Sequence, residues 1–259
     1  MLHLMLHHYL LKKLLTLFLN NLKLDILAFA AHPDDVELGC SGTLIKHQLL
    51  GLKIGIVDLT CGELGTRGNA ILRAEESSKA STILKISARE NLGFADGFFK
   101  NDKEHLLPII QKIRKYQPDI IFANAIEDRH PDHARAAKLV ADACFYAGLS
   151  KIVTLEGAQE QAPWRPKSLY HYIQYNYIKP DFVIDISNEM ETKIQAILAY
   201  SSQFYDPSSK EPETPISSLA FLNSLKERAS DLGRMIHVNY AEGFTTTRLL
   251  GVNNLKNLI

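Results

Sequence analysis

The stretch AFAAHPDDVELGCSGT, residues 28–43, joins an apolar run to a polar cluster. Its first part belongs to LDILAFAA (24–31), a short apolar run of the length expected for a buried strand. This run ends in His32, Asp34 and Asp35. Ionisable side chains directly after a core strand lie at the rim of a sheet, where they can meet a ligand. The stretch therefore predicts a core strand that opens onto a polar site.

Strands and helices alternate along the chain from Leu24. SGTLIKHQLLG (41–51) predicts a helix with Ser41 as its N-cap and Gly51 as its stop, and KIGIVDLT (53–60) predicts the next strand. Further helices are predicted over 71–86, 104–116 and 134–148, and further strands over 90–94 and 118–124. This alternation indicates an α/β fold with a doubly wound, mostly parallel sheet flanked by helices.

The last third of the chain predicts a C-terminal α/β elaboration of that sheet. KSLYHYIQY (167–175) and DFVIDIS (181–187) are typical of strands, and helices are expected over 189–201 and 218–235. Neither an internal repeat nor a clear linker interrupts the sequence. We therefore expect residues 23–259 to form one domain.

Residues 1–22 form a leucine-rich extension ahead of this domain. Lys12 and Lys13 interrupt its apolar stretches, which are too short to cross a bilayer, and no small-residue cleavage site follows. We expect an amphipathic helix or a disordered segment, although a start codon chosen too far upstream would give the same sequence. No function is assigned to the extension.

Composition points to a small-molecule partner in a reducing compartment. The 29 Lys and Arg residues balance 29 Asp and Glu residues, which excludes a general attraction to nucleic acid or to an anionic membrane. Cys40, Cys61 and Cys144 are odd in number and far apart, which argues against a disulfide framework and against a thiolate zinc site. These features favour a cytoplasmic protein.

Two short motifs carry the chemistry: HPDD at residues 32–35 and HPDH at residues 130–133. In a doubly wound sheet both motifs follow the carboxyl ends of strands, where ligands bind. Imidazole nitrogen and carboxylate oxygen suit Zn²⁺, and a catalytic zinc site keeps one position open for water. Adjacent carboxylates allow one to bind the metal while its neighbour acts as a base.

Either motif taken alone would favour a simple turn, because Pro and Asp are common in turns and Asp can cap a helix. Two of them at strand ends of one sheet favour a shared site instead. The residues by themselves thus predict a metal-dependent hydrolase and leave its substrate open.

The sequence resembles the zinc-dependent PIG-L/LmbE-like N-acetylglucosaminide deacetylases. AHPDDVELGCSGT and EDRHPDH carry this resemblance. DLTCGELGTRG, LRAEE, RENLGFADGFF, FVIDIS, AYSSQF and YAEGF extend it to the bacillithiol-biosynthesis branch, which deacetylates N-acetylglucosaminyl malate. The resemblance implies a Rossmann-like fold and a small-molecule sugar conjugate as substrate. Because relatives form multimers, it also makes a homo-oligomer the expectation.

The resemblance also implies roles for individual residues. Three metal ligands are implied: His32, Asp35 and His133. Asp34 would be the general base, and His130 would stabilise or protonate the tetrahedral intermediate and the leaving amine. Asp132 would orient an imidazole by hydrogen bonding. Zn²⁺ is the implied metal, while Fe²⁺, Mn²⁺ or Co²⁺ also suit such ligands.

Substrate contacts are expected from the loop GELGTRG. Arg67 can recognise a carboxylate such as that of malate, and Glu63 can bond sugar hydroxyls, although both residue types are also common on surfaces. Arg73 and Glu76 lie three apart on a predicted helix, which favours a solvated ion pair. We expect Arg129 to pair with a nearby carboxylate.

Two positions depart from the resemblance. Cys61 stands where many members of the branch have a larger polar or basic residue, and Phe221 is the second. Some relatives place a tyrosine near the oxyanion, but Phe221 aligns there and has no hydroxyl to donate. Tyr200, Tyr205 and Tyr240 are the alternatives for that role.

Two other functions remain open alternatives. Deacetylation of another acetamido sugar such as chitobiose would leave Arg67 without an anion to bind. A nucleotide-binding or regulatory module on the same fold is disfavoured, because the first β-α turn lacks G-x-G-x-x-G.

Overall fold

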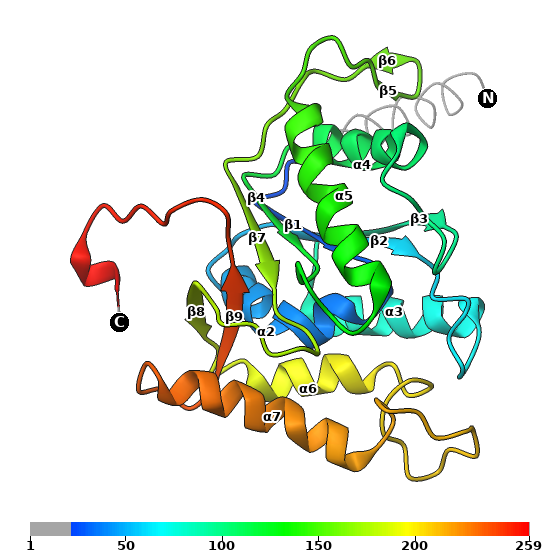
Figure 1. The fold of residues 1–259 in the computed structure, drawn as a ribbon, viewed down its shortest axis with the longest axis vertical. Coiled ribbons are helices and arrows are strands. Elements are labelled where there is room, and N and C mark those ends of the chain that lie inside the picture. The colour runs from blue at the N-terminus through cyan, green and yellow to red at the C-terminus, as the bar shows by residue number, and fades with distance from the viewer. Residues whose placement is uncertain (1–21, 259) are drawn as a thin grey trace, which may run out of the picture.

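A seven-stranded sheet forms the centre of the protein in a computed structural model that describes residues 22–258 (Figure 1). The strands are ordered β3-β2-β1-β4-β7-β9-β8 across the sheet. Their bounds are β1 (Ile26–Ala30), β2 (Ile54–Thr60), β3 (Ala88–Phe94), β4 (Ile120–Ala123), β7 (Ser168–Tyr172), β8 (Phe182–Asp185) and β9 (Ala241–Thr245). β1 pairs in parallel with β2 and β4, and β9 runs antiparallel to both of its neighbours. The predicted α/β class with a mostly parallel sheet is confirmed.

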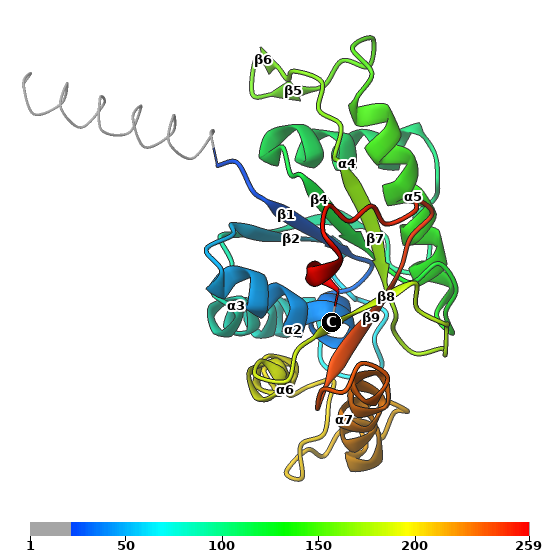
Figure 2. The same ribbon diagram turned by 90° about the vertical axis from the view of Figure 1, so that its left-hand side faces the viewer.

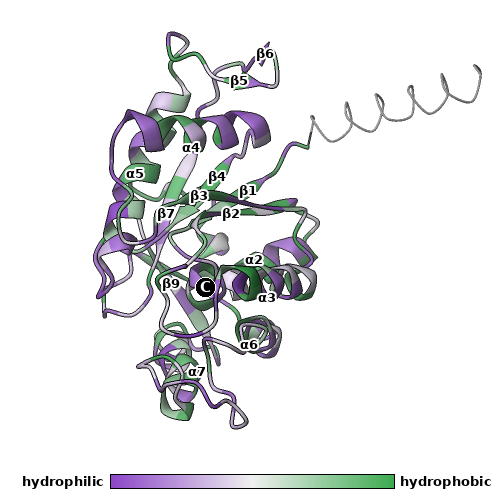
Figure 3. Ribbon diagram, turned by 90° about the vertical axis from the view of Figure 1, so that its right-hand side faces the viewer, coloured by the Kyte–Doolittle hydropathy of each residue, from purple (hydrophilic) through white to green (hydrophobic). Residues whose placement is uncertain are grey.

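Helices cover both faces of this sheet (Figure 2). On one face lie α4 (Lys103–Tyr116) and α5 (Pro131–Ala147), and on the other lie α2 (Asp35–Leu49), α3 (Ala70–Leu84) and α6 (Met190–Leu198). α7 (Leu219–Arg234) packs against β9 beyond α6. Figure 3 shows hydrophobic strands between helices of mixed polarity, as expected for a sheet buried on both faces.

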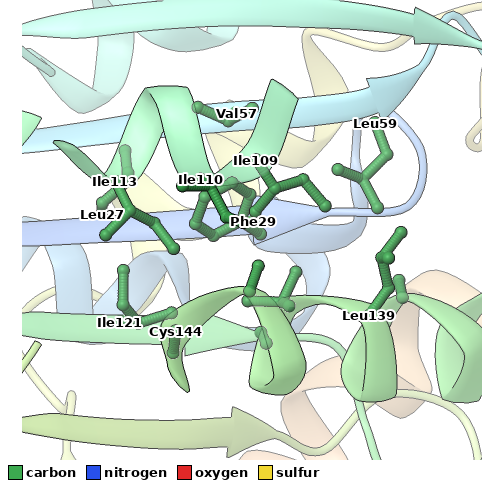
Figure 4. Packing of buried hydrophobic residues seen from close by; sticks show 14 of the residues in the cluster. Leu27, Phe29, Val57, Leu59, Ile109, Ile110, Ile113, Ile121, Leu139 and Cys144 are labelled. Carbon is green, nitrogen blue, oxygen red and sulfur yellow. The ribbon is translucent and has the colours of Figure 1, made fainter. Parts of the chain in front are cut away.

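Alternate residues of β1 supply the two sides of the core. Leu27 and Phe29 pack with Ile109 and Leu139 of α4 and α5, and all four side chains are fully buried (Figure 4). Ile26, by contrast, belongs to the cluster on the α2 face. Because successive side chains of a strand point to opposite faces of the sheet, β1 packs against the helices of both layers.

Two helices begin earlier than the sequence predicts. α2 starts at Asp35, so Ser41 is not an N-cap; it is buried inside the helix, and its hydroxyl donates to the Glu37 carbonyl (2.7 Å). α5 starts at Pro131, where a missing N–H is harmless, and its N-cap is His130. HPDH therefore forms the N-cap and first turn of α5, whereas HPDD leads into α2 and ends at its first residue.

Other differences concern short or late elements. The hairpin β5 (Leu155–Glu156) and β6 (Gln159–Glu160), the strand β9 and the 3₁₀ turn Leu255–Asn257 were not predicted. Residues 1–21 of the proposed extension lie outside the described residues. Within the described chain, every helix is too short or too polar to serve as a membrane span.

Candidate active site

The carboxyl ends of four parallel strands converge on one region. His32 follows β1, Asp96 follows β3, Asn124 follows β4 and Gln174 follows β7. The start of α5 adds the HPDH motif from the same side. A cavity of about 500 Å³ opens here, and its lining includes both motifs. The region predicted from the strand ends is therefore a real concave site.

Asp35 lies between the two histidines that the resemblance implies as metal ligands, with a different carboxylate oxygen facing each. Asp35 Oδ1 lies 3.1 Å from His133 Nε2, and Asp35 Oδ2 lies 3.5 Å from His32 Nδ1. These distances bracket the ~3.3 Å between ligand atoms that tetrahedral zinc with bonds of ~2.0–2.1 Å requires. One ring nitrogen from each of His32, His130 and His133 also lies within 4.8 Å of the other two, so these three histidines form an alternative set of donors. The residues present thus fit a divalent transition metal.

Two buried amides hold the Asp35 carboxylate. Asn124 Nδ2 donates to Asp35 Oδ2 (2.9 Å), and Gln174 Nε2 donates to Asp35 Oδ1 (2.8 Å). The backbone N–H of His32 donates to Oδ2 as well (2.9 Å). Hydrogen bonds of this kind orient a ligating carboxylate before the metal arrives.

Carboxylates flank the second ring nitrogen of His32. Its Nε2 lies 3.0 Å from Asp96 Oδ1 and 3.4 Å from Asp132 Oδ2, while Nδ1 faces Asp35. Burial lowers the pKa of His32, but the hydrogen bonds to Asp132, Asp35 and Asp96 outweigh it and hold that pKa well above its usual value. Asp96 and Asp132 therefore fix the ring with Nδ1 toward the cluster.

A further carboxylate orients His133. Its Nδ1–H donates to Asp128 Oδ2 (2.6 Å), which leaves Nε2 directed at Asp35. Burial opposes protonation, yet the charge of Asp35 and the hydrogen bond to Asp128 raise the pKa of His133 to about 9. The Asp35 pKa is held well below its usual range despite burial, chiefly by His133.

Asp34 occupies a strained backbone position beside an arginine. Its φ of 125° lies in the region that side chains disfavour, and its side chain is buried. Arg73 Nη1 donates to Asp34 Oδ2 (3.0 Å) and to the Pro33 carbonyl (2.7 Å). Burial raises the pKa of Asp34 to about 7, against the lowering effect of Arg73. A carboxyl with this pKa is suited to general acid–base chemistry near neutral pH.

The expected solvated pair of Arg73 and Glu76 is therefore wrong. Both side chains are buried, and Glu76 instead accepts hydrogen bonds from the backbone N–H and hydroxyl of Ser202. The i, i+3 spacing favoured a surface ion pair, and nothing in the sequence showed that another segment, which includes Ser202, packs on α3.

One ring nitrogen of His130 accepts a hydrogen bond, and the other is available to a ligand in the cavity. The backbone N–H of Asp132 donates to His130 Nδ1 (3.2 Å), so the neutral ring carries its proton on Nε2. Burial and the charges of His32 and His133 lower the pKa of His130. Asp132 thus contacts two imidazoles, His130 through its backbone and His32 through its side chain.

The structure does not bring Arg67 and Glu63 into the cavity lining. The Arg67 guanidinium is buried and donates to the Ser209 hydroxyl, and its carbonyl accepts from Gln203. Glu63 accepts from the backbone N–H of Asp96 (2.8 Å). In this structure both residues brace the loop after β2, and neither faces the cavity where a substrate would lie.

Phe221 does line the cavity, as its alignment implied. Tyr200 is buried and donates to Glu37, and neither Tyr205 nor Tyr240 lines the cavity. Among the residues that the structure describes, Tyr175 is the only tyrosine that lines the cavity. It stacks near Phe221, with ring centroids 6.4 Å apart.

Several site residues escaped the sequence analysis: Asp96, Asn124, Asp128 and Gln174. Three of these are polar residues that follow a core strand at its carboxyl end, as His32 does. Their position directly after a core strand was the feature of the sequence that could have identified them.

Known proteins share this architecture. A diacetylchitobiose deacetylase of Thermococcus kodakarensis is 30% identical over 189 residues, which cover 69% of this chain and 70% of the relative. The conserved protein TT1542 of Thermus thermophilus superimposes with a TM-score of 0.77 at 37% identity, covering 89% of this chain and 98% of that one. An N,N'-diacetylchitobiose deacetylase of Pyrococcus horikoshii has the same fold, with a TM-score of 0.71 at 24% identity over 90% of this chain and 88% of the other.

The fold and the His/Asp cluster at its carboxyl edge define an amide-hydrolysing enzyme of a metal-dependent class. The sequence model of the PIG-L family, described as GlcNAc-PI de-N-acetylase, matches residues 27–144. The chain belongs to this family.

Proposed function

We propose that the enzyme removes the N-acetyl group from an N-acetylglucosamine conjugate. The observation that carries the proposal is the juxtaposition of Asp34 with His32, Asp35 and His133 at one cavity. A base beside a metal site is the minimum that hydrolysis of an unactivated amide needs.

His32 Nδ1, Asp35 and His133 Nε2 would hold the metal, with Zn²⁺ the best match to this nitrogen and oxygen set. The chemistry such an ion supplies when bound is Lewis acidity toward the amide carbonyl and acidification of water. The amides of Asn124 and Gln174 keep Asp35 in place throughout.

Asp34 would take the proton from the attacking water. Its pKa of about 7 allows it to accept that proton and then to give it to the nitrogen that leaves. Arg73 holds the carboxylate in one orientation, so the base is preorganised.

His130 would donate a hydrogen bond to the oxygen on which negative charge develops. The neutral ring carries its proton on Nε2, so this donor does not require the imidazolium form. With Phe221 unable to donate, that task falls more heavily on His130.

For the conjugate itself we propose N-acetylglucosaminyl malate, in a cytoplasmic pathway. The motif agreement with the bacillithiol branch supports this choice, and the free thiols Cys40, Cys61 and Cys144 suit that compartment. A second candidate is diacetylchitobiose, because a relative with 30% identity is a deacetylase of that sugar.

The test combines metal analysis with release of free amine. Purified protein is assayed on N-acetylglucosaminyl malate, diacetylchitobiose and N-acetylglucosamine, with zinc content measured in parallel. We expect one zinc per chain and the fastest release from the malate conjugate. Faster release from diacetylchitobiose would replace the malate assignment, and release from none of them would overturn the deacetylase proposal.

A further inference from the structure

One side of the active-site cavity is apolar. Four residues of the lining also pack against a single buried hydrophobic cluster: Leu38, Ile216, Phe221 and Leu225. We call these four residues the apolar wall. They come from α2, from the segment before α7 and from α7 itself, so the wall exists only in the folded chain. Apolar side chains that face a ligand cavity favour an apolar part of the ligand.

The apolar wall begins beside the groups proposed for catalysis. Leu38 follows Asp35 by three positions on α2, a spacing that places both side chains on one face of the helix. The backbone N–H of Leu38 also donates to the Asp34 carbonyl (2.9 Å). The wall therefore starts one helical turn from the proposed base and metal ligand, where the acyl carbon of a bound amide would lie.

The rest of the cavity lining is polar. It includes Asp96, Asp128, Arg129, Gln174 and Arg228. Arg129 stacks over the Tyr175 ring (4.6 Å to the ring centre) and takes part in no ion pair among residues 22–258, so its expected pairing with a carboxylate is wrong. The carbonyl carbon of the substrate carries a sugar on its nitrogen side and an acyl chain on its carbon side. Because sugar hydroxyls need hydrogen-bond partners, the sugar belongs to the polar lining and the acyl chain to the apolar wall.

Phe221 keeps the wall free of hydroxyl groups at the position where some relatives place a tyrosine. Its ring is nearly parallel to those of Tyr175 and Phe204, with centroids 6.4 and 6.3 Å away. Phe204 is fully buried, so this stacking anchors the wall to the core. The single methyl of an acetyl group covers only a small part of a wall made of four large side chains.

We propose that the apolar wall accepts N-acyl chains longer than acetyl, so that the enzyme also hydrolyses longer N-acyl amides of its glucosamine conjugate. This inference rests on the proposed deacetylase function. The reaction balances as deacetylation does: water adds to the acyl carbon, the C–N bond breaks, the acyl group leaves as a carboxylate and the amine takes up the proton. The gain from a longer chain comes from methylene groups removed from water.

The test varies the acyl group on the conjugate that releases amine fastest, with acetyl, butyryl and hexanoyl forms. We expect kcat/KM of the wild type to rise by about tenfold from acetyl to butyryl, because each buried methylene contributes about fourfold. Leu225→Asn should lower the ratio of butyryl to acetyl kcat/KM by about tenfold. Leu219→Asn is the matched control, since Leu219 also lies on α7 but is 48% exposed and outside the cavity lining, and it should leave the ratio unchanged.

Phe221→Tyr tests the wall with almost no change of size. Its added hydroxyl should lower the same ratio, and this variant still tests the proposal if Leu225→Asn fails to fold. Zinc content and melting temperature are measured for each variant. An unchanged ratio in every folded wall variant would overturn the assignment.

Two further outcomes separate this inference from its basis. If the wild type releases amine from the acetyl form but no faster from the butyryl form, the inference fails and the deacetylase proposal stands. A second series keeps the acetyl group and lengthens an alkyl aglycone; a rise in kcat/KM in this series alone would overturn the acyl assignment.

If no form releases amine, the deacetylase proposal fails, and calorimetry of the zinc-loaded protein with acetate, butyrate and hexanoate tests the wall itself. Binding that tightens with chain length in the wild type but not in Leu225→Asn would support an acyl-chain site. Equal binding of the three carboxylates would overturn it.

Discussion

Arg73 Nη1 donates at once to the Asp34 carboxylate (3.0 Å) and to the carbonyl of Pro33 (2.7 Å). Asp34 has a φ of 125°, a conformation that costs ~1–3 kcal/mol and persists only where neighbouring groups enforce it. The buried guanidinium of Arg73 thus holds both the backbone at Pro33 and the carboxylate of Asp34, the proposed base.

Replacement of Arg73 should disable the base without removing the metal. For Arg73→Ala we expect kcat to fall by about 100-fold, because a base displaced by about 1 Å loses that much, with zinc content unchanged. Added guanidinium ion should restore part of the activity. Loss of zinc together with activity would show that Arg73 supports the metal ligands instead.

Variants of Asp34 and His133 should separate catalysis from metal binding. Asp34→Ala is expected to keep its zinc and to lose turnover by ~10²–10⁴-fold, because only proton transfer is removed. His133→Ala should lose both, because a ligand is missing. Zinc content and amine release decide the matter, and a fully zinc-loaded His133 variant would contradict its assignment.

His130→Ala tests whether this histidine is a hydrogen-bond donor or a ligand. If His130 donates a hydrogen bond to the developing oxyanion, the variant should have a kcat lower by ~10²–10³-fold and nearly unchanged zinc affinity. A large fall in zinc affinity would instead favour the cluster of His32, His130 and His133 as the ligand set.

Zinc affinity should rise with pH. The His133 pKa of about 9 means that the metal-free protein holds a proton there at neutral pH, and the metal must displace it. The apparent Kd should therefore fall by about tenfold per pH unit for each proton released, up to about pH 9. Calorimetry in buffers of different ionisation enthalpy measures the proton directly. In Asp128→Asn, which weakens a hydrogen bond that raises this pKa, the dependence should shift to lower pH.

The packing of α2 on β7 should be intolerant of one methyl group. A Cβ at Gly39 would collide with the ring of Tyr172, which is fully buried and fixed by its hydrogen bond to the Phe29 carbonyl (2.8 Å). Gly39→Ala should lower the free energy of unfolding by ~1–3 kcal/mol in urea titrations. Gly251→Ala, with open space around it, is the matched control.

Particular patterns in the sequence predicted most of the fold. The apolar runs that became β1, β2 and β4 were recognisable because a strand buried on both faces needs unbroken apolar character. Helix starts were less accurate: the cap at Ser41 was wrong because a polar residue inside a buried helix resembles a cap when its partners are unknown. The β5–β6 hairpin escaped because strands of two residues show no period, and β9 escaped because Glu242 and Gly243 interrupt its apolar character.

The sequence by itself determined the alternation of strands and helices and placed HPDD and HPDH at strand ends, because periodicity and local residue chemistry are written along the chain. Only the tertiary structure decided which side chains meet. It buried Arg73 beside Asp34, set Gln174 against Asp35, withdrew Arg67 from the cavity and joined Arg129 to Arg228 through Tyr175. Each of these contacts joins residues at least 39 positions apart along the chain, and such pairings are set by how the sheet and helices pack, which no local pattern records.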